Sequence, residues 1–93
     1  MTNKPNNCID ANKLESVLYI IDGYESMVKN IRDESVSELH EETDILKRRL
    51  FTEEISRYDK LLEHTEEAKE GMREHITNCA RIDPDRYKKY YRW

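Results

Sequence analysis

Apolar residues recur with a helical period along most of the chain. In the first third they form a seam with heptad spacing, which consists of Leu14, Val17, Ile21, Tyr24, Val28 and Ile31. Heptad spacing is typical of a helix that packs one face against a second helix. Leu18, Ile20 and Met27 widen this apolar stripe, so we expect the helix to contact more than one neighbour. With Asp10 as its N-cap, the pattern predicts a first helix over about residues 11–32.

The heptad pattern is interrupted after Ile31, because the next two seam positions are Ser35 and Glu38. These two residues have the S-x-x-E spacing of a capping box, in which the serine and the glutamate each bind a free backbone N–H at a helix start. We therefore predict a tight connection at residues 32–34 and a second helix from Ser35 to about residue 80. The alternative is one unbroken helix with a polar interruption.

The second predicted helix carries two apolar series that do not share a phase. The first is Val36, Leu39, Thr43, Leu46 and Leu50, and the second is Phe51, Ile55, Tyr58, Leu62, Thr65, Met72, Ile76 and Cys79. Because no proline or glycine separates them, we expect a continuous or slightly kinked helix with a register shift near Phe51. A break at Phe51-Thr52 is the alternative, and it would give a compact three-helix bundle.

The unequal lengths of the two predicted helices have a consequence for assembly. In an antiparallel hairpin the first helix covers mainly the N-terminal half of the second. The distal half then exposes an apolar stripe, for which we predict partner binding: Ile55, Tyr58, Leu62, Met72 and Ile76. An exposed stripe of this length indicates a homo-oligomer or a hetero-oligomeric coiled-coil complex.

The last thirteen residues, 81–93, differ from the rest in charge and in aromatic content. They hold five basic and two acidic residues, whereas the first 80 residues hold 11 basic and 18 acidic ones. Asp83 followed by Pro84 and Asp85 is typical of a helix start, so we predict a short helix to about Tyr91. The sequence therefore predicts an acidic body with a basic, aromatic tip.

This tip is a second candidate for contact with a partner protein, since Tyr, Trp and Arg are enriched at binding hot spots. The candidate residues are Arg86, Tyr87, Tyr90, Tyr91 and Trp93. In one alternative the aromatic side chains cap the end of the helical bundle within the chain. In another, basic residues bind nucleic-acid phosphates while aromatic rings stack on bases, which the net charge of −4 for the whole chain disfavours.

Composition supports an all-α fold and disfavours an enzyme. Charged residues make up 39% of the chain, and glycine and proline number two each, as is typical of helical proteins. A chain of 93 residues is too short for a Rossmann unit or a TIM barrel. We see no phosphate-binding glycine loop and no nucleophile motif, and a thin hairpin offers no concave pocket. We therefore predict no catalytic residues, no cofactor and no small-molecule substrate.

The cysteines and histidines give no metal-binding motif. Cys8 and Cys79 are distant and lack CxxC spacing, so we do not expect a disulfide framework. We interpret Cys79 as a small buried apolar residue and place Cys8 in a flexible tail. The three histidines, which lack the spacing of the di-iron and zincin motifs, are predicted to be solvated: His40, His64 and His75.

The predicted organisation is a flexible tail (1–9), a helical hairpin (10–80) and a basic, aromatic helix (81–93). We see no transmembrane run and no signal peptide, so we expect an intracellular protein of the cytoplasm or nucleus that is neither secreted nor membrane-spanning. The predicted function is a non-enzymatic structural or adaptor subunit that assembles through its coiled-coil seam. The alternatives are a small acidic regulator that sequesters one target protein and a nucleic-acid-associated factor. The sequence does not identify the partner.

Overall fold

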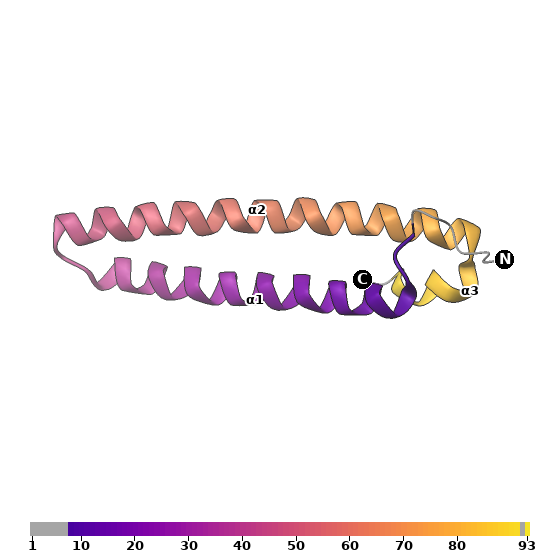
Figure 1. The fold of residues 1–93 in the computed structure, drawn as a ribbon. Helices are drawn as coiled ribbons and strands as arrows, with labels where there is room; N and C mark the ends of the chain where they lie inside the picture. Colours follow the sequence, from indigo (N-terminus) through magenta and orange to yellow (C-terminus); the bar gives the residue numbers. More distant parts are fainter. Residues whose placement is uncertain (1–7, 92) are drawn as a thin grey trace.

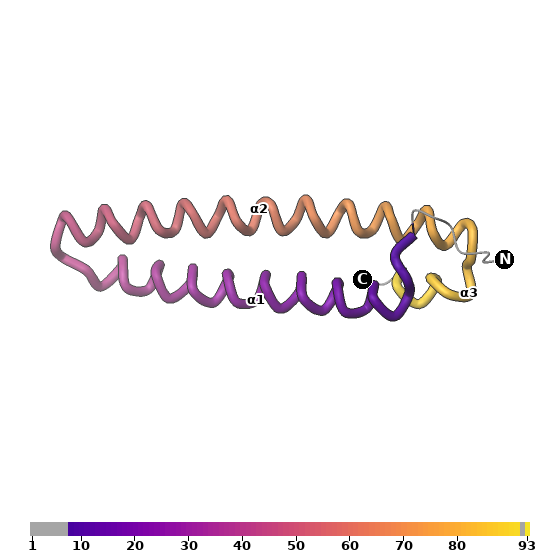
Figure 2. Tube along the Cα trace, viewed as in Figure 1, coloured from indigo at the N-terminus to yellow at the C-terminus, as the bar shows by residue number. Residues whose placement is uncertain are grey.

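The computed structural model describes residues 8–91 and 93, and all regular structure in that part of the chain is helical (Figure 1). Helix α1 spans Ala11–Glu41 and helix α2 spans Ile45–Ile82. A one-turn helix α3, Pro84–Tyr87, and a 3-10 turn η1, Lys88–Tyr90, follow. The two long helices lie side by side and antiparallel along almost their whole length (Figure 2). This confirms the predicted all-α hairpin with a long second helix and a short C-terminal helix.

The connection between the long helices lies at residues 42–44. Asp44 is the N-cap of α2, since its Oδ1 accepts the backbone N–H groups of Leu46 (2.8 Å) and Lys47 (3.3 Å). The Arg48 guanidinium donates to two carbonyl oxygens at the end of α1, at 2.9 and 2.8 Å. Two side chains at the start of α2 thus bind backbone groups that the ends of both helices leave without an intrahelical partner.

The predicted connection at residues 32–34 is therefore wrong, and helix α1 continues through it. Ser35, the predicted N-cap, is a buried residue of α1 with only 6% of its surface exposed. A serine side chain is small enough to lie in the contact between two helices. A second small polar residue, Thr65, is also buried, and its hydroxyl donates to the Leu61 carbonyl oxygen of its own helix at 2.8 Å.

The later turn makes α1 long enough to cover the distal half of α2. Ile76 is consequently 1% exposed, and Met72 packs against the same core. Ile55, Tyr58 and Leu62 are half-buried. The expectation that this stripe is exposed in a monomer is therefore wrong, because its cover comes from the same chain. Helix α2 also runs unbroken past residue 51, as the preferred interpretation of the sequence expected.

The packed core lies at the end of the rod where the two ends of the described chain meet, opposite the turn (Figure 1). Its buried members come from α1, α2, α3 and η1: Leu14, Leu18, Ile76, Cys79, Ala80, Tyr87 and Tyr90. At the turn end, by contrast, Ile45 is 83% exposed and Leu46 71%. The molecule measures 65 × 18 × 16 Å, so its core is thin and is concentrated at one end.

Two ion pairs join the long helices between these ends. The Lys69 ammonium donates to both carboxylate oxygens of Glu25, at 3.1 and 3.2 Å, and each side chain is 16% exposed. Closer to the turn, Arg32 donates to the Asp59 carboxylate. Lys69 lies seven residues after Leu62 and seven before Ile76, and so occupies a seam position of α2. Its pairing with Glu25 explains how a charged residue is accommodated where an apolar one would pack.

The Glu25–Lys69 pair predicts a pH-dependent contribution to stability. Hydrogen bonding from Lys69 lowers the pKa of the Glu25 carboxyl below its usual 4.5, although burial opposes this. A pKa lower in the folded than in the unfolded state stabilises the fold above the unfolded pKa, and this contribution is lost as the pH falls through the folded pKa. We expect Glu25→Gln to lower the unfolding free energy by about 1 kcal/mol near neutral pH, and by less in acid.

Denaturant titrations of both proteins, from neutral pH to below 4.5, measure this difference. Glu53→Gln is the matched control, because Glu53 and Arg49 form an i,i+4 pair at 3.9 Å with side chains 54% and 78% exposed. This control should change stability little. A loss for Glu25→Gln that stays constant as the pH falls would rule out the ionic contribution.

Candidate protein-interaction surface

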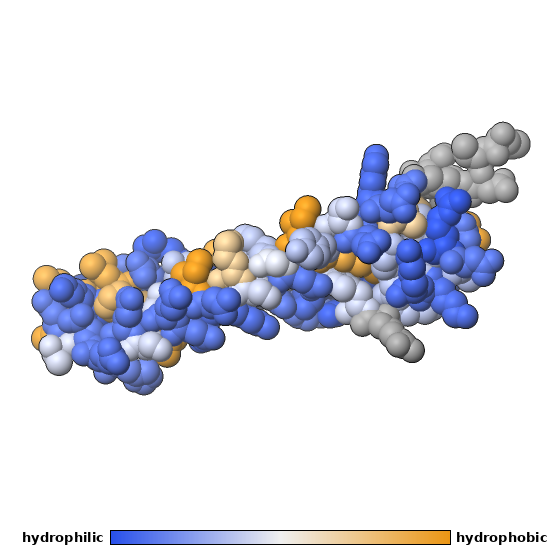
Figure 3. Space-filling model, turned by 90° about the horizontal axis from the view of Figure 1, so that it is seen from below, coloured by the Kyte–Doolittle hydropathy of each residue, from blue (hydrophilic) through white to orange (hydrophobic). Residues whose placement is uncertain are grey.

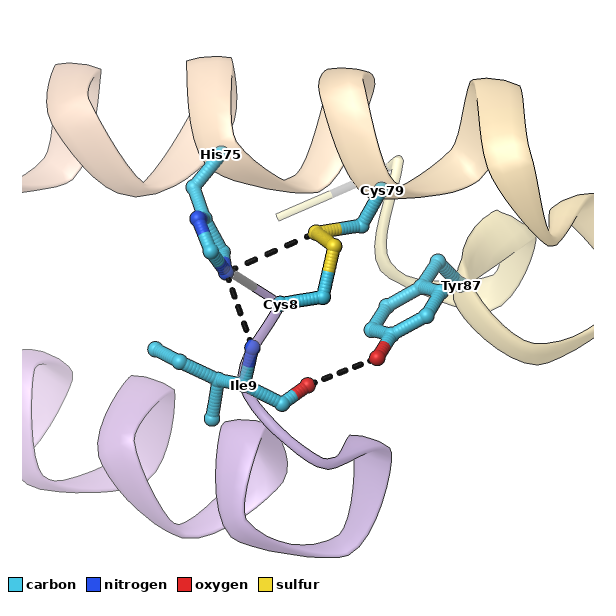
Figure 4. Close-up of a disulfide and its surroundings, with 5 residues drawn as sticks. All are labelled: Cys8, Ile9, His75, Cys79 and Tyr87. Atoms are coloured by element: carbon cyan, nitrogen blue, oxygen red, sulfur yellow. Dashed lines mark hydrogen bonds between the residues drawn. A yellow bond between two sulfur atoms is a disulfide. The ribbon is translucent and has the colours of Figure 1, made fainter. Parts of the chain in front are cut away.

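The aromatic tip folds back onto the start of α1. Tyr87 is fully buried, and its hydroxyl donates to the Ile9 carbonyl oxygen at 2.7 Å (Figure 4). Tyr90 is 9% exposed and donates to the Ala11 carbonyl oxygen at 2.8 Å. These two candidate partner-binding residues therefore hold the N-terminal segment against the C-terminal helices. A buried tyrosine whose hydroxyl has a partner is well placed for such a role.

Trp93 also makes its contacts within the chain. Its indole N–H donates to the Asp22 carboxylate on α1 at 2.8 Å. Its ring lies 5.9 Å from the Lys69 ammonium and 5.7 Å from the Arg73 guanidinium, both on α2, within the range of cation–π attraction. These contacts agree with the alternative prediction that the aromatic side chains of the tip cap the end of the helical bundle within the chain. Of the five candidate partner-binding residues in the tip, Arg86 and Tyr91 are exposed.

A disulfide joins Cys8 to Cys79 across 71 positions of sequence (Figure 4). The expectation of two unpaired cysteines is therefore wrong, as is the placement of Cys8 in a flexible tail; residues 1–7 of that tail lie outside the described chain. Cys79 is 1% exposed and belongs to the apolar core, as its seam position predicted. Cys8 is half-buried and fixes the chain just before α1 to the end of α2.

His75 lies beside this disulfide, so the expectation of three solvated histidines is wrong for this residue. Its Nε2 accepts the backbone N–H of Ile9 at 3.1 Å and lies 3.5 Å from Cys79 Sγ (Figure 4). The ligand atoms of Cys8, His75 and Cys79 all lie within 4.8 Å of one another. His40 and His64 are exposed, as expected.

Helix α1 exposes an apolar stripe beside its contact with α2. It consists of Ile20, Tyr24, Met27 and Ile31, with exposed fractions of 66%, 40%, 51% and 36%. Their spacing of four, three and four residues places them on one side of the helix. Two of them, Tyr24 and Ile31, were assigned to the internal seam by their heptad spacing. The structure places both toward solvent, next to the residues that widen the stripe.

Residues of α2 extend this stripe across the hairpin. A shallow groove of about 310 Å³ runs between the two helices, lined by Ile20, Ile21, Tyr24, Leu61, His64, Thr65 and Ala68. Leu61 is 37% exposed and Ala68 is also exposed. We call the surface formed by Ile20, Tyr24, Met27, Ile31, Leu61 and Ala68 the apolar face.

Further exposed apolar residues lie toward the turn. Leu50 is 59% exposed and precedes Leu61 by eleven residues, about three helical turns, on the same side of α2. Figure 3 shows apolar surface both along the middle of the rod and at its turn end. Exposed apolar surface of this kind on a small protein is a candidate site of interaction with another molecule.

The chain matches no protein-family model, no curated protein and no solved structure. Across residues 8–91 and 93, none of the helices combines the length and the apolar character needed to cross a membrane.

Proposed function

We propose that this protein is a non-enzymatic interaction subunit that binds an amphipathic helix of a partner protein along the apolar face. The observation that carries the proposal is the exposure of Ile20, Tyr24, Met27 and Ile31 on one side of a long helix. Helices that lie in grooves of other proteins present anchors at i, i+3, i+4 and i+7. The stripe on α1 repeats with the same period and spans about three turns.

The shape of the apolar face also favours a helical partner. Gly23 lies between Ile20 and Met27 in sequence, and a Cβ atom built at Gly23 would meet no atom within 4 Å. A partner backbone can therefore approach α1 closely at this point. The groove between α1 and α2 gives a ridge on the partner helix a place to pack, as in ridge-into-groove packing between helices.

The docking surface therefore lies beside the internal seam, on the flank of α1 that borders the groove with α2. The predicted seam residue Ile76 is in the core, as is Tyr87 of the tip. The nucleic-acid alternative loses support for the same reason, because the rings of Tyr87 and Tyr90 are buried and would not stack on bases.

Site-specific cross-linking in the native cell tests the proposal. The full-length chain carries a photoreactive phenylalanine analogue in place of Tyr24. We expect one defined adduct whose cross-linked peptide maps to the apolar side of a helix. Combining this probe with Ile20→Asp and Met27→Asp should lower the adduct yield at least about tenfold, because two charges would be buried against apolar partner groups.

The matched control uses Ser26, an exposed polar residue on the other flank of α1. The probe at Ser26 should give no such adduct, and Ser26→Asp should leave the Tyr24 adduct unchanged. If Tyr24 gives no adduct above the Ser26 level, the apolar face is not a docking surface. A cross-link to the same protein, together with a doubled solution mass, would identify the partner as a second copy.

A further inference from the structure

The cluster of Cys8, His75 and Cys79 contains the atoms of a metal site as well as a disulfide. His75 and Cys79 are four residues apart on α2, so their side chains lie on the same side of the helix, one turn apart. Two zinc ligands four residues apart on one helix are a recurrent arrangement. Cys8 reaches the same point from the segment before α1, as the disulfide shows.

The distance between the two α2 ligand atoms fits a tetrahedral zinc ion. With Zn–S of about 2.3 Å and Zn–N of about 2.05 Å, a tetrahedral angle separates sulfur and nitrogen by about 3.6 Å. The observed separation between Cys79 Sγ and His75 Nε2 is 3.5 Å. Once the disulfide bond is absent, the Cys8 sulfur moves away from the Cys79 sulfur, and a space bounded by three ligand atoms opens.

The protonation of His75 suits a ligand. Its Nε2 accepts the Ile9 N–H, so in the neutral ring the proton is carried by Nδ1. Zinc would take the same Nε2 lone pair, so metal binding would replace this hydrogen bond. Cys79 lies in an apolar surround that includes Leu14, Leu18 and Tyr87. Such a surround controls how much solvent reaches a metal centre.

We propose that, when Cys8 and Cys79 are reduced, they and His75 bind one zinc ion, with water as the fourth ligand. Two sulfurs, one imidazole and an open position form a known type of zinc site. The disulfide and the metal site are mutually exclusive, because each uses both sulfur atoms. The N-terminal segment is thus fixed to the end of α2 by a covalent bond in one state and by a metal in the other.

A phosphine and one water molecule are sufficient to reduce the Cys8–Cys79 disulfide to two thiols. The phosphine supplies two electrons that break the S–S bond and becomes a phosphine oxide, taking its oxygen from water. The two hydrogen atoms of that water protonate the sulfurs and give two thiols. Zinc then displaces both thiol protons to solvent as it binds the two thiolates and the His75 nitrogen.

Cobalt(II) binding to the full chain tests the proposal, since tetrahedral cobalt–thiolate sites give sulfur-to-cobalt charge-transfer and intense d–d absorption bands. We expect the reduced chain, freed of phosphine under nitrogen, to bind one cobalt ion and release it to one equivalent of zinc. The oxidised chain should bind none. Zinc should also raise the Tm of the reduced chain, because a ligand that binds only the folded state stabilises it.

His75→Gln is the decisive variant, because a glutamine oxygen can still accept the Ile9 N–H but is a poor zinc ligand. We expect it to weaken cobalt binding to the reduced chain at least about tenfold, while the oxidised variant keeps the wild-type Tm. His64→Gln, at an exposed position of the same helix, should bind as wild type. Failure of the reduced wild-type chain to bind cobalt, or equal binding by His75→Gln, would overturn the proposal.

Discussion

The double substitution Cys8→Ser and Cys79→Ala is expected to lower the free energy of unfolding by about 4 kcal/mol. The bond joins residues 71 positions apart. A cross-link that closes so long a loop removes much of the conformational freedom of the unfolded chain. Alanine suits position 79 because this site is 1% exposed and apolar. Denaturant titration in metal-free buffer gives the two free energies.

The wild-type chain itself provides the control for this prediction. Reductant should lower its stability by a similar amount and leave the variant unchanged. Zinc is omitted because the reduced wild-type cluster would bind it. If the oxidised wild type and the variant unfold at the same denaturant concentration, the disulfide does not contribute through loop closure.

The hairpin follows from the sequence because helical periodicity is a local property. Each long helix has apolar residues on a continuous side, and little proline or glycine interrupts them. The position of the turn, by contrast, depends on contacts between the two helices. Ser35 and Glu38 have a capping-box spacing, yet both lie inside α1 and the serine is buried. A capping motif stabilises a helix start but does not create one where the apolar contacts of a continuous helix are available.

The turn could have been located by comparing the lengths of the two helices that each turn position produces. A hairpin with a turn at residues 32–34 leaves half of the second helix uncovered, with an apolar stripe in water. A turn at 42–44 gives two helices of 31 and 38 residues and covers that stripe. Because burial of apolar surface dominates folding, the arrangement with helices of similar length is favoured.

The missed disulfide has the same origin as the misplaced turn. In an antiparallel hairpin, residues equally far from the turn face each other. A turn at 32–34 places Cys8 opposite about residue 58, whereas a turn at 42–44 places it opposite about residue 78, beside Cys79. The proximity of His75 follows from the same register. The cysteine–histidine cluster could thus be predicted only from the register, because no spacing motif contains it.

The apolar face was visible in the sequence only in part. Ile20 and Met27 lie outside the heptad seam, and for that reason they indicated a second neighbour for the first helix. Tyr24 and Ile31 have seam spacing and nevertheless face solvent, at 40% and 36% exposed. In a straight helix of 3.6 residues per turn, a seven-residue series drifts around the surface. Two interleaved series therefore cannot both stay in the contact with α2.

Ile76→Asp is expected to destabilise the chain by at least about 4 kcal/mol, since it places a carboxylate in an apolar core without a partner. Ile76 is 1% exposed and belongs to the cluster that includes Leu14 and Tyr87. Met27→Asp, on the apolar face, should change stability by less than about 0.5 kcal/mol, because Met27 is 51% exposed. Denaturant titration of both variants measures these changes.

These two variants distinguish whether the internal seam, which contains Ile76, is a docking surface or part of the core. If the internal seam were the docking surface, as helix lengths inferred from the sequence suggest, Ile76→Asp would leave the chain folded and remove only its partner. The structure places Ile76 in the core, so Ile76→Asp should destabilise the fold. Under the proposed function, Met27→Asp should instead weaken the Tyr24 cross-link of a folded chain. A folded Ile76→Asp variant with wild-type stability would show that α1 does not cover the distal half of α2, because a buried aspartate cannot be accommodated there at so small a cost.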